Sequence, residues 1–329
     1  MAICYGSRRS FADFLYVLMI APFFEDRQPC DKVRAMLRLR FVFPTSVLLM
    51  LFCAPRCYTQ EAQNSPQIID RFAMIFGAKI HYVDVGSGPP VILLHGLADD
   101  IGVWASVIPA LAAKHRVIAF DQLGFGRSDK PLLNYRVSTF VDFLDGLLNE
   151  LKIERASLIG NSFGGWVAAD FALKHPDRVE RLVLSDAPGY AAVAKSMDPR
   201  ALSALRLASR DDIRYLGPLT FHQKRFYEDV DLAFRQRVMA GDSYTVSRIL
   251  DSMIRGEDAL DNRLAAIKQP TLILWGREDR LIPLSFGERL NHEIAASELR
   301  IIDNCGHMPH VECPDQFNAA VLQFFSKTK

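Results

Sequence analysis

The sequence predicts an α/β fold in which a mostly parallel central sheet is flanked by helices. From about residue 66 onward, short runs rich in β-branched residues alternate with longer amphipathic runs. Strands that alternate with helices require right-handed crossovers, which place helices on both faces of a parallel sheet. The chain has 329 residues, of which 50% are hydrophobic, so it has enough apolar surface to bury such a sheet.

The expected elements follow one another in a regular order. Strand-like runs occupy residues 79–86, 90–96, 116–121, 155–160, 180–186, 270–276 and 297–303, and helical runs occupy residues 104–114, 137–151, 166–176 and 315–327. The turn sequence GSGP separates the first two strands, and Pro176 ends the third helix, because proline cannot continue a helix. This order predicts a core made of residues 66–188 and 270–329.

The interval from Pro188 to Gln269 interrupts this alternation. It contains no convincing strand and is much longer than a single crossover needs. Three runs in it have a helical pattern: residues 198–209, 222–240 and 245–256. We therefore expect residues 189–269 to form a helical lid inserted in the core. Six of its aromatic residues could line a pocket, and we expect at least half to pack a core instead: Tyr190, Tyr215, Phe221, Phe226, Tyr227 and Phe234.

The first 60 residues differ from the rest of the chain. They contain two apolar runs, residues 11–24 and 41–54, each shorter than the ~20 residues that span a bilayer as a helix. The second run follows Arg34, Arg38 and Arg40, and a basic flank before an apolar run is typical of a secretory signal. We expect residues 1–60 to be an extension with a signal peptide or a membrane anchor. The protein would then be exported or membrane-associated, and cytoplasmic if the segment is not a functional signal.

The charge of the chain argues against nucleic acid as a partner. Its 39 basic and 38 acidic side chains are mixed throughout and leave a formal net charge of +1. A polyanion-binding protein would be expected to concentrate basic residues on one surface. The partner that we expect is instead a small molecule with an apolar acyl or carbonyl group.

The cysteines do not form a disulfide framework. Four of the six lie in the first sixty residues, and only Cys305 and Cys313 belong to the body of the chain. These two could form one bridge in an oxidising compartment or remain two free thiols. The sequence leaves both alternatives open.

The stretch LIGNSFGGW, residues 158–166, predicts an exposed nucleophile. Ser162 lies between Gly160 and Gly164, after a strand and before a helix, which is the context that gives the G-x-S-x-G pattern its meaning. The glycines relieve crowding in a sharp turn, and the helix behind the serine places its positive dipole end near any developing oxyanion.

A serine hydroxyl is a poor nucleophile and needs a base, which in turn needs an orienting acid. Asp279 follows the strand at 270–276, and His307 follows the strand at 297–303 and comes after Gly306. Both lie just past the carboxyl end of a strand, where ligands meet open parallel sheets. We therefore predict Ser162, Asp279 and His307 as a catalytic triad. Because the histidine must be neutral to act as a base, activity should fall in acid.

With these motifs the chain resembles the α/β-hydrolase family over roughly residues 66–328. The sequence LLHGLADD at 93–100 is similar to the family's oxyanion loop, and DQLGFGRSD at 121–129 is common among its epoxide-hydrolase-like and esterase-like branches. The resemblance implies that the backbone N–H groups of Leu97 and Phe163 form the oxyanion hole. Four residues of the second segment are expected to be structural: Asp121, Gly124, Gly126 and Ser128.

Each predicted role has a rival. His310 lies three residues past His307, Glu278 precedes Asp279, and Asp186 follows the strand at 180–186, where some members of the family keep their acid. We prefer His307 and Asp279 because they hold the usual family positions. His95 is expected to shape its loop. No H-E-x-x-H or cysteine–histidine spacing indicates a metal, and we expect no cofactor.

The identity of the nucleophile narrows the range of possible reactions. A serine at 162 argues against the epoxide hydrolase and haloalkane dehalogenase branches, whose chemistry needs a carboxylate. We expect acyl transfer by a carboxylic-ester hydrolase, with a C–C bond hydrolase of meta-cleavage-product type as the alternative. Three features count against that alternative: the loop 95–104 lacks a second glycine-rich turn, Met308 replaces the usual tryptophan, and an exported enzyme would be separated from cytoplasmic substrates. A non-catalytic ligand-binding protein is a further alternative, and the oligomeric state stays open.

Overall fold

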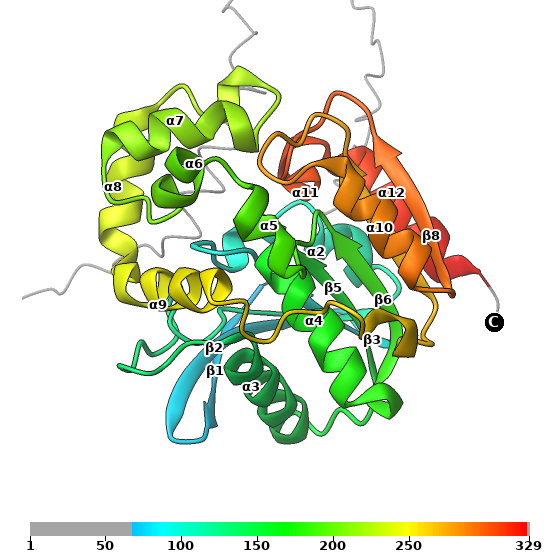
Figure 1. The fold of residues 1–329 in the computed structure, drawn as a ribbon. Coiled ribbons are helices and arrows are strands. Elements are labelled where there is room, and N and C mark those ends of the chain that lie inside the picture. Colours follow the sequence, from blue (N-terminus) through cyan, green and yellow to red (C-terminus); the bar gives the residue numbers. More distant parts are fainter. Residues whose placement is uncertain (1–67, 328–329) are drawn as a thin grey trace, which may run out of the picture. The chain divides into compact units, whose positions relative to one another are not determined.

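The computed structural model describes residues 68–327, through which one 8-stranded sheet runs in the order β1-β2-β4-β3-β5-β6-β7-β8 (Figure 1). The strands are β1 (Asp70–Ile75), β2 (Ala78–Val85), β3 (Pro90–Leu94), β4 (Arg116–Phe120), β5 (Ala156–Asn161), β6 (Val179–Ser185), β7 (Thr271–Gly276) and β8 (Ser297–Ile302). Strand β2 pairs antiparallel with β1 and β4, and every other pair is parallel. The predicted α/β fold is confirmed.

The central strands are apolar over their whole length because both faces of the sheet are covered. In β3, alternate side chains join two different clusters. Ile92 and Leu94 pack with residues of α3 (Val137–Glu150) and α4 (Phe163–Lys174) on one face. Val91 and Leu93 pack with residues of α2 (Ile108–Ala112) and α12 (Pro314–Ser326) on the other. The two-residue repeat of the strand thus supplies both halves of the core.

The remaining helices of the core are short or lie near the late strands. They are η2 (Ile101–Trp104), η3 (Pro176–Arg178), α10 (Leu284–Glu293) and α11 (Pro309–Glu312). The predicted helix at 104–114 is wrong in its bounds, since η2 and α2 replace it. Asp100 begins η2 by accepting the Gly102 N–H at 2.7 Å, and Pro109 lies in the first turn of α2.

Strand β1 has no counterpart among the predicted strands. It is an edge strand with a largely exposed burial pattern, and its side chains at Phe72 and Met74 are 43% and 59% exposed. Such a strand lacks the continuous apolar run that marks the buried strands. Its pairing with β2, which joins Phe72 to His81, is decided by the hairpin.

The segment between Pro188 and Gln269 contains helices and no strand in the part of the chain that the structure describes. The helices are α5 (Ala191–Ser196), α6 (Pro199–Ala204), α7 (Arg210–Thr220), η4 (Lys224–Phe226), α8 (Val230–Ala240), α9 (Ser243–Ile254) and η5 (Leu264–Ala266). In Figure 1, α6, α7 and α8 form a group at the upper left and α9 lies below it. The predicted helix at 222–240 is wrong in its first half, because Asp229 caps a new helix by accepting the Leu232 N–H at 2.8 Å.

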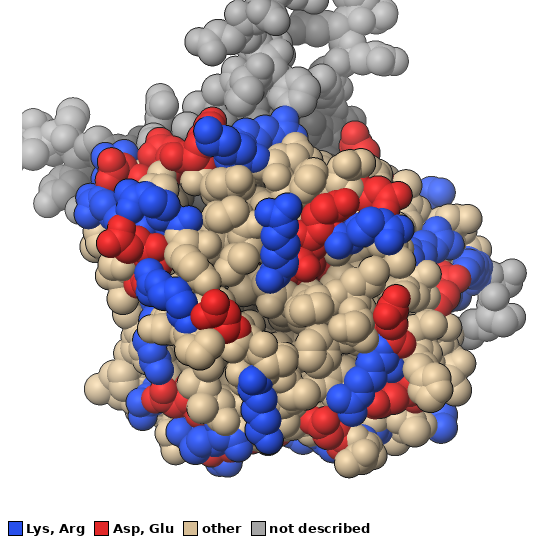
Figure 2. Space-filling view, turned by 45° about the horizontal axis from the view of Figure 1, so that its top comes forward, with Lys and Arg blue, Asp and Glu red and all other residues tan. Residues whose placement is uncertain are grey.

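The predicted N-terminal extension, residues 1–60, lies outside the described residues. Over residues 68–327, no helix has both the length and the apolar character that crossing a bilayer requires. On the face drawn in Figure 2, basic and acidic side chains are interspersed, as the near-neutral composition predicts.

Candidate active site

Ser162 lies on a strained turn between β5 and α4. Its backbone angles, φ 51° and ψ −121°, are rare for a residue with a side chain. A methyl group on Gly160 would come within 2.3 Å of the Gly164 carbonyl oxygen, and one on Gly164 within 2.2 Å of the Leu94 carbonyl oxygen. Both glycines are therefore required by the close approach of the turn to β3 and to itself, as the sequence predicts.

The two other predicted triad residues are directly joined. His307 Nδ1 lies 2.7 Å from Asp279 Oδ2, and both side chains are buried. The other oxygen of Asp279 accepts the Leu281 and Ile282 N–H groups, each at 2.8 Å. Because Nδ1 faces the carboxylate, Nε2 is the ring atom left to receive a proton from a nucleophile.

Ser162 is connected to this pair less directly. Among residues 68–327, no hydrogen bond joins its hydroxyl to His307. The preceding residue, Asn161, donates its side-chain N–H to the His307 carbonyl oxygen at 3.1 Å and so holds the two loops together. Catalytic hydrogen bonds are often long before substrate binds, so this geometry is compatible with the predicted pair.

A third acidic group belongs to the same cluster. Atoms of Asp186, Asp279 and His307 that could ligate an ion all lie within 4.8 Å of one another. Burial first, and then the neighbouring charge of Asp279, raises the pKa of the Asp186 carboxyl well above its usual range. Such a cluster could hold a metal ion, but His307 Nδ1 and Asp279 are already joined by a hydrogen bond, and we expect no metal there.

Two of the three rivals for the base and the acid, His310 and Glu278, have structural contacts. His310 is fully buried, its ring lies 4.3 Å from that of Trp104, and burial followed by the charge of His307 lowers its pKa to about 3. His310 therefore stays neutral near pH 7 and packs as a ring against its aromatic neighbour. Glu278 accepts the Cys305 N–H at 2.8 Å and so braces the loop that carries His307.

The predicted oxyanion loop lies beside the nucleophile. A methyl group on Gly96 would come within 3.5 Å of Ser162 Cβ. In the described residues, the turn and loop hydrogen bonds include none donated by the Leu97 or Phe163 N–H. Within that part of the chain both amides lack an acceptor, and their role as an oxyanion hole stays a prediction from the resemblance.

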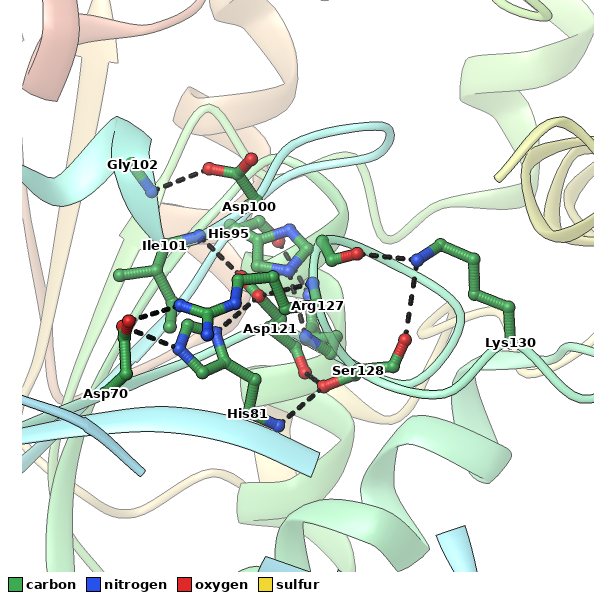
Figure 3. A network of polar contacts seen from close by, with 12 residues as sticks. Asp70, His81, His95, Asp100, Ile101, Gly102, Asp121, Arg127, Ser128 and Lys130 are labelled. Atoms are coloured by element: carbon green, nitrogen blue, oxygen red, sulfur yellow. Dashed lines mark hydrogen bonds and ion pairs between the residues drawn. The ribbon is translucent and has the colours of Figure 1, made fainter. Parts of the chain in front are cut away.

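A polar network supports this loop from below (Figure 3). Asp121 accepts the Ile101 N–H at 2.8 Å and the Arg127 N–H at 2.7 Å, and its carboxylate lies 2.7 Å from His81 Nδ1. The other ring nitrogen of His81 faces Asp70 at 2.9 Å. Burial opposes protonation of His81, but the hydrogen bond and charge of Asp121 outweigh it and raise the pKa. The network links β1 and the segment 121–129 to the oxyanion loop.

The residues expected to be structural have structural contacts. A methyl group on Gly126 would collide with the Asp121 carboxyl at 2.2 Å. His95 Nδ1 lies 2.8 Å from the Gly96 carbonyl oxygen, and its Nε2 accepts the Gln122 N–H at 3.0 Å. Burial lowers the pKa of His95, so both nitrogens of a neutral ring are used. This histidine shapes the loop, as predicted.

The sequence interpretation missed two acids in the oxyanion loop. Burial and the neighbouring Asp100 raise the pKa of Asp99 to about 7, and burial and Asp121 raise that of Asp100 to about 6. Asp99 is half-buried, and its carboxylate lies 2.8 Å from the position of a methyl group on Gly96. The signal was two adjacent acids in an apolar loop, but only the fold places Asp99 beside the nucleophile.

Arg237 on α8 was also missed. It is 7% exposed and forms an ion pair with Asp242, while its Nε and Nη2 have no hydrogen-bond partner within the described residues. Its charge opposes, without reversing, the rise in the pKa of Asp99, so the guanidinium acts electrostatically on the oxyanion loop. No sequence signal distinguishes this arginine from the other basic residues of the chain.

The helical segment 189–269 contacts both loops that carry Asp279 and His307. His307 donates its N–H to the Thr220 carbonyl oxygen at 2.7 Å, and Arg280 donates its N–H to the Leu219 carbonyl oxygen at 3.2 Å. A methyl group on Gly306 would come within 2.3 Å of the Thr220 carbonyl oxygen. Gly306 is thus needed for the end of α7 to approach His307.

Cys305 and Cys313 form a disulfide, with their Cα atoms 6.3 Å apart. The sequence left this pairing open. The bridge encloses both His307 and His310, so it closes the loop that carries the proposed base.

Known proteins are similar to this chain in architecture and in sequence. Residues 89–314 match the model of the α/β hydrolase fold family. The chain is 32% identical over 279 residues to a 2-hydroxymuconate semialdehyde hydrolase of Pseudomonas sp. (strain CF600), covering 80% of this chain and 96% of that one. It is 33% identical over 268 residues to a 2-hydroxy-6-oxo-2,4-heptadienoate hydrolase of Pseudomonas putida F1, covering 78% and 96%.

Solved structures of similar proteins superpose on this fold. A meta-cleavage product hydrolase from Pseudomonas fluorescens IP01 superposes with a TM-score of 0.70 at 32% identity, over 78% of this chain and 97% of that one. A bacterial membrane phospholipase A superposes with a TM-score of 0.69 at 26% identity, over 78% and 86%. The strained serine turn, the eight-stranded sheet and these matches lead to one conclusion: the chain belongs to the α/β hydrolase fold family and is a hydrolase of that fold.

Proposed function

We propose that the chain is a serine hydrolase that cleaves a C–C bond beside a carbonyl group in a dienoate of the meta-cleavage-product type. The observation that carries this proposal is Arg237, a buried cation that is ion-paired with Asp242 through Nη1 and keeps Nε and Nη2 without a hydrogen-bond partner in the described residues. A buried guanidinium with free donors suits a carboxylate, and the dienoates in the names of the relatives carry one.

The reaction begins at Ser162. His307 Nε2 accepts the hydroxyl proton as the oxygen attacks the substrate carbonyl, and Asp279 stabilises the imidazolium through Nδ1. The Leu97 and Phe163 N–H groups receive the oxyanion, and one such donor can contribute ~3 kcal/mol. The C–C bond can break once the 2-hydroxyl group of the dienoate has ketonised, because the electron pair is then delocalised through the C=C bond onto the new C2 carbonyl. His307 returns the proton to that fragment.

Hydrolysis of the acyl-enzyme repeats the same roles with water. His307 accepts a proton as water attacks the acyl carbonyl, and then returns it to Ser162 Oγ as the carboxylic acid product leaves. In these acyl-transfer steps every proton passes through one imidazole.

This proposal reverses the order of the two enzyme alternatives drawn from the sequence. The carboxylic-ester hydrolase was favoured there partly because of an expected export segment, and that segment lies outside the described residues. The activities of the relatives support the C–C bond hydrolase better.

An ester hydrolase remains the second candidate because of Asp99. An acid with a pKa of about 7 beside Ser162 would repel an anionic substrate once it ionises, whereas a neutral ester would tolerate it. The phospholipase among the structural neighbours acts on an ester according to its name.

The test compares two substrates in two variants. Arg237→Met should raise the KM for 2-hydroxy-6-oxo-2,4-heptadienoate about 30-fold, since a lost charged hydrogen bond costs ~2 kcal/mol, and should leave p-nitrophenyl ester hydrolysis nearly unchanged. Arg235→Met, at an exposed position of the same helix, is the matched control. Ester turnover without any dienoate turnover would favour the second candidate. A purified chain that neither turns over a substrate nor reacts with a fluorophosphonate would be a binding protein.

A further inference from the structure

A second buried carboxyl lies against the proposed acid and base and has no part in the mechanism above. Asp186 directly follows β6, its side chain is fully buried, and it lies within 4.8 Å of Asp279 and His307. Its φ of 47° is unusual for a residue with a side chain, so the position is constrained by its surroundings. This group needs an explanation because an unpaired buried charge is costly.

Two buried carboxyls in contact cannot both be ionised at neutral pH. The hydrogen-bond donors decide which of them is the anion. Asp279 accepts three, from the Leu281 N–H, the Ile282 N–H and His307 Nδ1. Asp186 accepts two, from the Gly276 N–H at 2.9 Å and the Ser185 hydroxyl at 2.8 Å. The charge is therefore more stable on Asp279, and the proton belongs on Asp186.

We propose that Asp186 is a neutral carboxylic acid at neutral pH that donates its proton to the Asp279 carboxylate, so that the acid of the site is a pair of carboxyls sharing one proton. Asp186 is then a positioning residue, because it acts through Asp279 and not on the substrate. Its donation adds to the donors around Asp279 and holds the carboxylate toward His307. This inference rests on the site assigned under the proposed function but not on which bond is cleaved.

The surroundings of Asp186 agree with a neutral acid. The titratable groups that face it in the described part of the chain are Asp279 and His307, and its other contacts, Ser185 and Gly276, are neutral. Burial and the charge of Asp279 both raise the pKa of Asp186. By contrast, the fully buried carboxyl of Asp170 has two cationic partners, Lys174 and Arg263.

The first test uses two variants and a readout that is independent of the natural substrate. Asp186→Ala removes the donor and should slow labelling of Ser162 by a fluorophosphonate about tenfold or more, since a hydrogen bond to a charged group is lost. Asp186→Asn keeps the shape, the neutrality and an N–H that can reach Asp279, so it should restore most of that rate. The pH at which labelling falls in acid should be the same in Asp186→Asn as in the wild-type protein.

A shift of that midpoint in Asp186→Asn to lower pH, by about half a unit or more, would overturn the proposal. Such a shift would mean that the substitution had removed a negative charge that favoured the imidazolium. Asp170→Asn is the matched control for replacing a buried aspartate. It leaves two cations unpaired and should lower the unfolding temperature, which Asp186→Asn should not.

A second measurement does not require activity. The infrared spectrum of the wild-type protein near pH 8.5, where an acid with the pKa of Asp99 is ionised, should contain a protonated carboxyl band that Asp186→Asn lacks. A wild-type spectrum without this band would refute the proposal. If no variant labels with the fluorophosphonate, the proposed function fails, and the infrared band still decides the state of Asp186.

Discussion

Replacing Asp99 with asparagine should make the stability of the protein less dependent on pH. In the folded protein the pKa of Asp99 is raised from 3.8 to about 7, first by burial and then by Asp100, so ionising it disfavours the folded state. The contribution of the neutral carboxyl to the stability of the folded protein is fully present below pH 3.8 and is lost as the pH rises through about 7. An asparagine at this position would have no charge to bury at any pH.

The free-energy cost of ionising Asp99 follows from the difference between its two pKa values. Each pKa unit between the two values corresponds to about 1.4 kcal/mol, so ionised Asp99 costs the folded protein at most about 4 kcal/mol. Asp99 keeps part of its surface accessible to solvent, and water screens the charge there, so we expect ~1–3 kcal/mol. Removing one of two neighbouring acids also relieves Asp100, which acts in the same direction.

The assay is denaturant unfolding of the wild-type protein and Asp99→Asn at about pH 5 and about pH 8.5. Part of this cost is already present at pH 5, so the free energy of unfolding of the variant should exceed that of the wild-type protein by ~0.6–2 kcal/mol more at the higher pH than at the lower. Asp211→Asn, at an exposed carboxylate on α7, is the control and should give a difference that is nearly independent of pH. An equal difference at both pH values for Asp99→Asn would refute the reasoning.

Three further predictions concern the site. Ser162→Ala should abolish hydrolysis and fluorophosphonate labelling while the unfolding temperature stays unchanged. If a variant that no longer reacts with the fluorophosphonate still hydrolyses substrate, Ser162 is not the nucleophile. Gly164→Ala should lower the free energy of unfolding by ~3 kcal/mol, because a methyl group would meet the Leu94 carbonyl oxygen at 2.2 Å and the backbone there cannot move aside. A variant as stable to denaturant as the wild-type protein would contradict the turn geometry. Reduction of the Cys305–Cys313 bridge should lower the free energy of unfolding by ~2.5 kcal/mol, measured with and without a thiol reductant, and a Cys305→Ser variant should lose its sensitivity to the reductant.

The periodicity of the chain predicted much of the sheet. The runs that became β3, β5 and β7 were recognisable because these strands are buried on both faces and therefore apolar throughout. Strand β1 was missed because an edge strand with exposed Phe72 and Met74 has no such run. The break between η4 and α8 was missed because an amphipathic pattern does not reveal where a side chain caps a new helix.

The residues of the candidate site were likewise predictable only in part from the sequence. Gly160, Ser162 and Gly164 are neighbours in the chain, so the turn that exposes the serine is a local property that the sequence by itself determined. Asp279 and His307 could be chosen because residues after parallel strands gather at one edge of the sheet. Their hydrogen bond follows from that rule.

Only the tertiary structure decided which other groups surround them. Asp186, Asp99 and Arg237 come from separate segments, and their local sequence does not reveal how deeply each is buried or which charges lie beside it. Their significance arises from burial and from distances to one another across the fold. The sequence determined the nucleophile and the order of strands, whereas the folded chain alone set the electrostatics, because charge–charge interactions depend on separation and burial and not on position along the chain.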